Sequence, residues 1–214
     1  MTAAFYFDLA SPDAYIAAER VLGELPGPAA WTPVLASELG AAAGSPGAAR
    51  GAGTVSLEAI EQRARELGLQ PLRWPDPFPF DSTYAMRVAT YARQIGRVVA
   101  FTQAAFRQAF AGGRSLADED SVLIAAAACE MHPSAVLRGA GLRSVIAELE
   151  QATAQARAGG VTAVPAVLVP GGGEAGAPAV FHGEASLGAA AACMRSLGAA
   201  GAQSPHGERS AAGP

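Results

Sequence analysis

Residues 5–15 read FYFDLASPDAY, and this stretch predicts a strand, a turn and a helix in succession. The aromatic run at residues 5–7 favours a strand. Ser11 is a typical helix N-cap, and Pro12 suits the first helical position. A glycine and a proline end the helix, and residues 31–35 predict a second short strand. The chain therefore opens as a β-α-β unit.

A long helical region follows this opening. Residues 36–53 are mostly Ala, Gly, Ser and Pro, which predicts a connection without a core of its own. From residue 56 the spacing of apolar residues becomes helical, apart from a loop at 74–80 rich in proline and aromatic residues. Helices are expected at about 56–67, 82–93, 98–111, 119–131, 134–139 and 142–158.

The pattern returns to β-structure after residue 160. Residues 161–169 predict a strand, a run of glycines turns the chain, and residues 179–182 complete a hairpin before a last helix at 186–197. Strand-helix-strand at the start and strand-strand-helix at the end is the order of a thioredoxin-like fold, of the α/β class, with an inserted all-helical domain. We place the thioredoxin-like domain at residues 1–40 plus 159–198, the helical insertion domain at 41–158 and a disordered tail at 199–214.

Charge and composition exclude several kinds of partner. The 214 residues include 15 arginines, no lysine and 19 acidic residues, and the net charge is −4. Because the arginines are scattered, we expect no nucleic-acid partner. Without a leader peptide or a run of about 18 apolar residues, we expect a cytoplasmic protein with no membrane partner. Cys129 and Cys193 form no CxxC pair and have no histidine at metal-ligand spacing, so we expect small core side chains and no metal site.

Ser11 is the candidate catalytic residue. In a thioredoxin-like fold, the turn after the first strand holds the reactive group at a helix N-terminus, which favours a negative charge. Ser11 and Ala14 stand where a disulfide oxidoreductase has its two cysteines, so this turn lacks the groups for thiol-disulfide exchange. A hydroxyl there instead donates a hydrogen bond to the thiolate of a small thiol and lowers the thiol's pKa. The alternative is that Ser11 only caps the helix.

Val164-Pro165 is the second feature of a thiol site. A proline inside an apolar strand removes a hydrogen bond of the sheet. In thioredoxin folds a cis-proline stands at this point, and the residue before it pairs its backbone with a bound thiol peptide. The sequence therefore predicts a cis bond between Val164 and Pro165. The alternative is a trans proline on an edge strand.

Together these features resemble the kappa-class glutathione transferases and 2-hydroxychromene-2-carboxylate isomerases, within the DsbA-like branch of thioredoxin folds. The resemblance covers about residues 4–190. It rests on short motifs in the family's order, at residues 5–8, 11–12, 15, 67–69, 74–79, 85–87, 160–165 and 181–183.

The resemblance implies a cofactor, glutathione or another low-molecular-weight thiol, and a homodimer. It places Ser11 beside the sulfur, Val164 and Pro165 against the cysteinyl backbone, and the Gly183 turn at the γ-glutamyl end. The family's Asp-Arg pair after this glycine is replaced by Ala185 and Ser186. The carboxylate for the γ-glutamyl ammonium is thus missing unless Glu184 replaces it.

Other positions complete the implied site. Ser45 and Arg50 stand where relatives have an Asn-containing loop and a basic residue. Asp13 replaces an aromatic residue and puts a negative charge beside the thiolate. Trp74 and Phe78, with Asp13, are expected to line the pocket of a small-molecule substrate. The alternative is that these two aromatic side chains pack into the helical core.

The resemblance implies an isomerase that acts on an aromatic or unsaturated carbonyl compound by reversible addition of the thiolate. Three alternatives stay open: a kappa-like glutathione transferase, a thiol-independent enzyme of specialised metabolism on the same fold, and a non-catalytic binding protein. His182 is a possible general base because its ordinary pKa is near 6.5, but its place at a strand end favours a packing or surface role.

Overall fold

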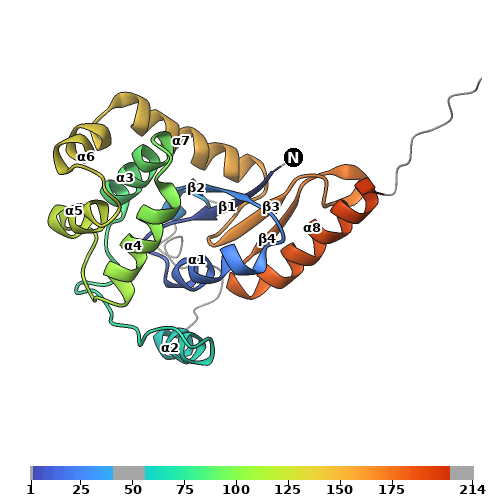
Figure 1. The fold of residues 1–214 in the computed structure, drawn as a ribbon, viewed down its shortest axis with the longest axis horizontal. Helices are drawn as coiled ribbons and strands as arrows, with labels where there is room; N and C mark the ends of the chain where they lie inside the picture. Colours follow the sequence, from blue (N-terminus) through green and yellow to red (C-terminus); the bar gives the residue numbers. More distant parts are fainter. Residues whose placement is uncertain (1, 41–55, 203–214) are drawn as a thin grey trace, which may run out of the picture.

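The computed structural model describes residues 2–40 and 56–202. Its strands form one mixed sheet in the order β2-β1-β3-β4 (Figure 1). β1 is parallel to β2, whereas β3 is antiparallel to both β1 and β4. The strand bounds are β1 Ala3–Phe7, β2 Ala29–Pro33, β3 Ala166–Val169 and β4 Ala179–His182. The first and last parts of the described chain therefore build one sheet.

Helices cover both faces of this sheet, because alternate side chains of a strand point to opposite faces. Phe5 and Phe7 belong to the large apolar cluster that includes α1 (Pro12–Glu24) and α8 (Leu187–Ala202). Tyr6 packs instead on a second apolar cluster with Ala156 of α7 (Arg143–Ala158). Figure 1 shows α1 and α8 on one side of the strands and α7 on the other.

The inserted helices share the core of the thioredoxin-like part. Helix α4 packs against α1, and the rings of Phe7 and Phe106 lie 6.2 Å apart. The large apolar cluster runs from β1 to Val136 in the helical block. The described part of the insertion, residues 56–158, thus shares this apolar cluster with the thioredoxin-like part. Its helices before α7 are α2 (Leu57–Glu66), α3 (Thr83–Gln94), α4 (Val98–Phe110), α5 (Glu119–Ala127) and α6 (Pro133–Ala140).

The predicted α/β class and order of elements are confirmed, but the strand predicted at 161–169 is wrong in its first half. β3 begins only at Ala166. The cause is Pro165, which has no N–H to donate to a neighbouring strand. Residues 161–165 instead form the loop that enters the strand.

Two helix ends were also predicted wrongly. Helix α5, expected to reach residue 131, ends at Ala127, and Glu130 then adopts a left-handed φ of 59°. Helix α8 continues to Ala202, so residues 199–202 are not part of a disordered tail. Alanine has the highest helix propensity, which accounts for this extension. Across residues 2–40 and 56–202, no helix is both long and apolar enough to cross a lipid bilayer.

Candidate thiol site

The candidate site begins at Ser11, the N-cap of α1. The backbone N–H of Ala14 donates to the Ser11 Oγ over 3.2 Å, and Pro12 opens the helix. The N-cap prediction is therefore confirmed. Among the described residues, the Ser11 hydroxyl donates its own hydrogen to no group. That hydrogen is available to an acceptor at the helix N-terminus.

Asp8 builds the turn that presents Ser11. Its carboxylate accepts the N–H of Ala10 over 2.9 Å and the N–H of Ala36 over 2.8 Å. Its backbone C=O accepts the N–H of Ser11 over 3.0 Å. Burial raises the pKa of Asp8, against the effect of the hydrogen bonds that its carboxylate accepts. One side chain thus ties the turn to the segment after β2.

Val164 and Pro165 lie beside this turn. Tyr6 of β1 is opposite Ala166 of β3, so the two residues before β3 lie next to the end of β1, where the Ser11 turn begins. The bond between Val164 and Pro165 is cis, as predicted. Neither the N–H nor the C=O of Val164 forms a hydrogen bond with another described residue. Both groups are therefore without a hydrogen-bond partner among the described residues, in a residue that is 9% exposed.

The turn after β4 completes this edge of the sheet. Gly183 adopts φ 81°, a conformation that favours glycine, and its N–H donates to the C=O of Pro165 over 2.8 Å. Glu184 follows it directly, and Ala185 is exposed. Gly183 is therefore held against the cis-proline.

Glu184 does not offer a free carboxylate. One oxygen pairs with Arg20 of α1, and the other accepts the Nε–H of Arg63 of α2 over 2.7 Å. The pKa of Asp13, on the first turn of α1, is raised by burial and, to a lesser degree, by the charge of Glu184. Asp13 thus lies in the field of the Glu184 carboxylate, which is paired with Arg20 and Arg63.

Trp74 and Phe78 meet in one aromatic cluster. Their rings lie 5.1 Å apart, and each lies 6.1 Å from the ring of Phe110. Phe110 in turn stacks on Tyr15 of α1 at 5.7 Å. The indole N–H of Trp74 donates to Glu61 over 2.6 Å. Both aromatic side chains are half-buried, so the cluster joins the helical core and also presents an aromatic surface near α1.

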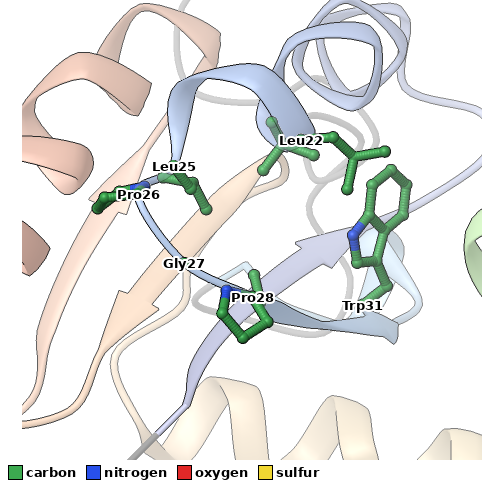
Figure 2. A pocket seen from close by; sticks show the side chains of 8 residues that line it. Leu22, Leu25, Pro26, Gly27, Pro28 and Trp31 are labelled. Carbon is green, nitrogen blue, oxygen red and sulfur yellow. The ribbon is translucent and has the colours of Figure 1, made fainter.

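Two cavities lie away from these residues. One, of about 260 Å³, is bounded by the end of α1, the connection to β2 and Trp31 (Figure 2). The other, of about 240 Å³, is lined by Tyr91 and residues 135–142. Neither includes Ser11, Val164 or Trp74.

The other titratable candidates are engaged elsewhere. The Nε2 of His182 accepts the N–H of Thr162 over 3.1 Å, and burial lowers the pKa of His182, so its lone pair is not free for a general base. Cys129 is buried in the helical block, and Cys193 lies on α8 against the β3–β4 turn. In residues 2–40 and 56–202, no three His, Cys, Asp or Glu side chains cluster as metal ligands.

The sequence analysis missed three residues of this site, and the structure does not test two of its candidates. Asp8, Arg20 and Arg63 carry its hydrogen bonds and ion pairs, yet only Asp8 had a local signal, an acidic residue directly after an aromatic strand. Ser45 and Arg50 lie outside the described residues.

Several solved structures share this fold. A 2-hydroxychromene-2-carboxylate isomerase is similar with a TM-score of 0.75 at 17% identity, over 96% of this chain and 100% of that chain. A probable DsbA oxidoreductase from Streptomyces coelicolor has a TM-score of 0.69 at 19% identity, over 100% and 97%. The cytosolic disulfide reductase DsbM from Pseudomonas aeruginosa, solved with GSH, has a TM-score of 0.61 at 15% identity, over 94% and 98%.

At such identities the similar structures show the fold alone, and their activities differ from one another. No curated protein matches the chain. The DSBA-like thioredoxin domain, however, matches residues 2–192, almost the whole described chain. By this match, the chain belongs to the DSBA-like thioredoxin domain family.

Proposed function

We propose that this protein is an isomerase that uses glutathione or another low-molecular-weight thiol as a cofactor and acts on an aromatic or unsaturated carbonyl compound. The observation that carries the proposal is that, among the described residues, a hydroxyl group without an acceptor and two backbone groups without hydrogen-bond partners lie at the same end of the sheet. The Ser11 hydroxyl has no acceptor among the described residues, and the unpaired N–H and C=O of Val164 lie at the same edge of the sheet.

In the proposed site, Val164 pairs with the backbone of the thiol's cysteinyl part, and Ser11 donates its hydrogen bond to the sulfur. This donor and the N-terminus of α1 stabilise the thiolate, so they lower the pKa of the bound thiol. Asp13 opposes them because its carboxylate is a second negative charge nearby. The aromatic surface of Trp74 and Phe78 suits an aromatic acceptor.

The reaction conserves the thiol. The thiolate adds to the β-carbon of the unsaturated carbonyl compound, so a C–S bond forms and the π electrons of the double bond move to the carbonyl oxygen. The former double bond is now single and rotates. The electrons then return, the C–S bond breaks, and the thiolate leaves the isomerised product.

A glutathione transferase is the second candidate, because it shares the first step and differs only in that the adduct is protonated and released. Two of the similar structures belong to a disulfide reductase and a probable oxidoreductase. We do not assign that chemistry to the α1 turn, since Ser11 and Ala14 occupy it and both cysteines lie elsewhere. A cytoplasmic location and a homodimer stay predictions.

The test is an isomerisation assay with and without thiol. The substrate is 2-hydroxychromene-2-carboxylate, and the thiol concentration is varied while free thiol is counted before and after the reaction. The proposal predicts a rate that rises with thiol and saturates, with no thiol consumed. Consumption of one thiol per turnover identifies the transferase. A rate independent of thiol contradicts both and favours the thiol-independent enzyme, and binding without turnover of any unsaturated carbonyl compound favours a binding protein.

A further inference from the structure

In the proposed thiol site, the end of the thiol far from the sulfur is expected near Gly183, which Glu184 follows directly. Gly183 donates its N–H to the C=O of Pro165, and Val164 precedes that proline. Glu184 is therefore one residue from the contact that joins this turn to the ligand-pairing edge. Its side chain is only 11% exposed, and both of its oxygens are held by arginines.

The two arginines come from different parts of the chain. Arg20 belongs to α1 and also pairs with Glu24, four residues along the same helix. Arg63 belongs to α2, and its guanidinium reaches both oxygens of Glu184, at 2.7 Å from Nε and 3.5 Å from Nη2. Arg63 is thus a cation that the helical insertion supplies to the thioredoxin-like part.

Helix α2 contacts the candidate site at both Glu184 and Trp74. Two residues before Arg63, Glu61 accepts the indole N–H of Trp74 over 2.6 Å. Ile60 and Ala64 on the same helix are buried in the large apolar cluster. These contacts fix α2, so the guanidinium of Arg63 is held at Glu184 by the packing of the whole helix.

A thiol with a cationic end would compete with this arrangement. Its ammonium group would have to displace Arg63 from Glu184 or enter as a third cation beside one carboxylate, and both are unfavourable. A thiol whose end carries no ammonium group does not compete with Arg63. Three further carboxylates lie near this cluster: Asp13 lies in the field of Glu184, Glu24 pairs with Arg20, and Glu66 pairs with Arg63 over 3.5 Å.

We propose that Arg63 determines which thiol this site accepts: it occupies the carboxylate that an ammonium group would need, so the site selects a low-molecular-weight thiol that has no ammonium group at its end near Gly183. This inference rests on the proposed function, because it concerns the same thiol site. It makes Arg63 a specificity-determining residue that does not touch the sulfur.

The test compares two thiols that differ only in the ammonium group. Glutathione and glutaryl-Cys-Gly, in which hydrogen replaces the amino group, are titrated by calorimetry at low ionic strength. The proteins are wild type, Arg63→Gln, Arg63→Lys and a control, Arg65→Gln, which changes an exposed arginine on the same helix. Circular dichroism and thermal unfolding check that each variant keeps its fold.

We expect wild type to bind glutaryl-Cys-Gly at least as tightly as glutathione. Arg63→Gln frees one oxygen of Glu184, so its affinity for glutathione should rise by about 10-fold, the lower end of the range for a charge-assisted hydrogen bond, because Arg63 is partly exposed. The affinity for glutaryl-Cys-Gly should not rise, and Arg63→Lys and Arg65→Gln should behave as wild type.

Two outcomes overturn the inference alone. One is a wild type that prefers glutathione, as pairing of the ammonium with Asp13 would give. The other is a ratio of the two affinities that is the same in Arg63→Gln and in wild type. If neither thiol binds wild type or any variant that has kept its fold, the proposed thiol site itself fails, and the inference fails with it.

Discussion

Replacing Ser11 by alanine separates its two possible roles, helix cap and thiol activator. The chain offers a matched control in Ser56, the N-cap of α2. Each serine accepts one backbone N–H over 3.2 Å, from Ala14 and from Ala59 respectively. Ser11→Ala and Ser56→Ala therefore remove the same capping hydrogen bond at two places in the fold.

The two effects differ in size. Loss of a serine N-cap costs about 1 kcal/mol of stability, and we expect this loss or less in both variants. Loss of one donor to a developing or bound anion typically lowers turnover by about 10- to 1000-fold, which corresponds to about 1.4–4 kcal/mol of the activation barrier. Only Ser11→Ala should show this second effect, because only Ser11 lies beside the free backbone of Val164.

Urea unfolding measures the first effect, and thiol-dependent isomerisation at saturating thiol measures the second. If Ser11→Ala turns over at the wild-type rate, Ser11 is only a cap and the thiol mechanism loses its donor. If both variants lose turnover equally, the loss comes from helix capping, and the catalytic role of Ser11 is wrong.

Three further predictions concern the carboxylates of the site. Wild type should bind glutathione with a Kd nearer millimolar than micromolar. Ala185→Asp should tighten binding by about 10- to 150-fold in calorimetry, because it restores a carboxylate at the family's position two residues after Gly183. The same substitution at exposed Ala189 should leave the affinity unchanged. Asp13→Asn removes a negative charge near the thiolate, so the rising limb of kcat/KM that reports thiol ionisation should move to lower pH, and a shift to higher pH would contradict this. Burial raises the pKa of Asp8 in the folded state above its ordinary value of 3.8. The unfolding free energy of wild type relative to Asp8→Asn should therefore fall as the pH rises from below 3.8 through the folded-state pKa. Urea unfolding that shows a rise over this range would refute that direction.

The fold could be predicted because its signals are local. Three elements are each indicated by residues that are neighbours in the sequence. These stretches are the aromatic run at residues 5–7, the Ser11-Pro12 helix start and the apolar run around Pro165. The cis bond was predicted from Pro165 in an apolar run together with the cis-proline that thioredoxin folds have at this point. The same proline explains the error at this point, where the strand was predicted to begin too early. Pro165, which indicates the thiol site, also prevents β3 from beginning before Ala166.

The network around the site could not be predicted, since its partners are far apart in sequence. Asp8 bonds to Ala36, 28 residues away, and Glu184 pairs with Arg20 and Arg63, which are 164 and 121 residues away. No periodicity or motif joins such positions, and only the packed structure brings them together. The family resemblance indicated that the family's Asp after Gly183 is missing here, but not that Arg20 and Arg63 pair with Glu184.

A crystal structure with a bound small thiol tests the central claim most directly. The protein is crystallised with whichever of glutathione and glutaryl-Cys-Gly binds more tightly. We predict that the sulfur lies within hydrogen-bonding distance of the Ser11 Oγ and that the cysteinyl N–H and C=O pair with the backbone of Val164. A thiol bound elsewhere, for example in the cavity beside Trp31 or as a mixed disulfide with Cys193, would contradict the claim.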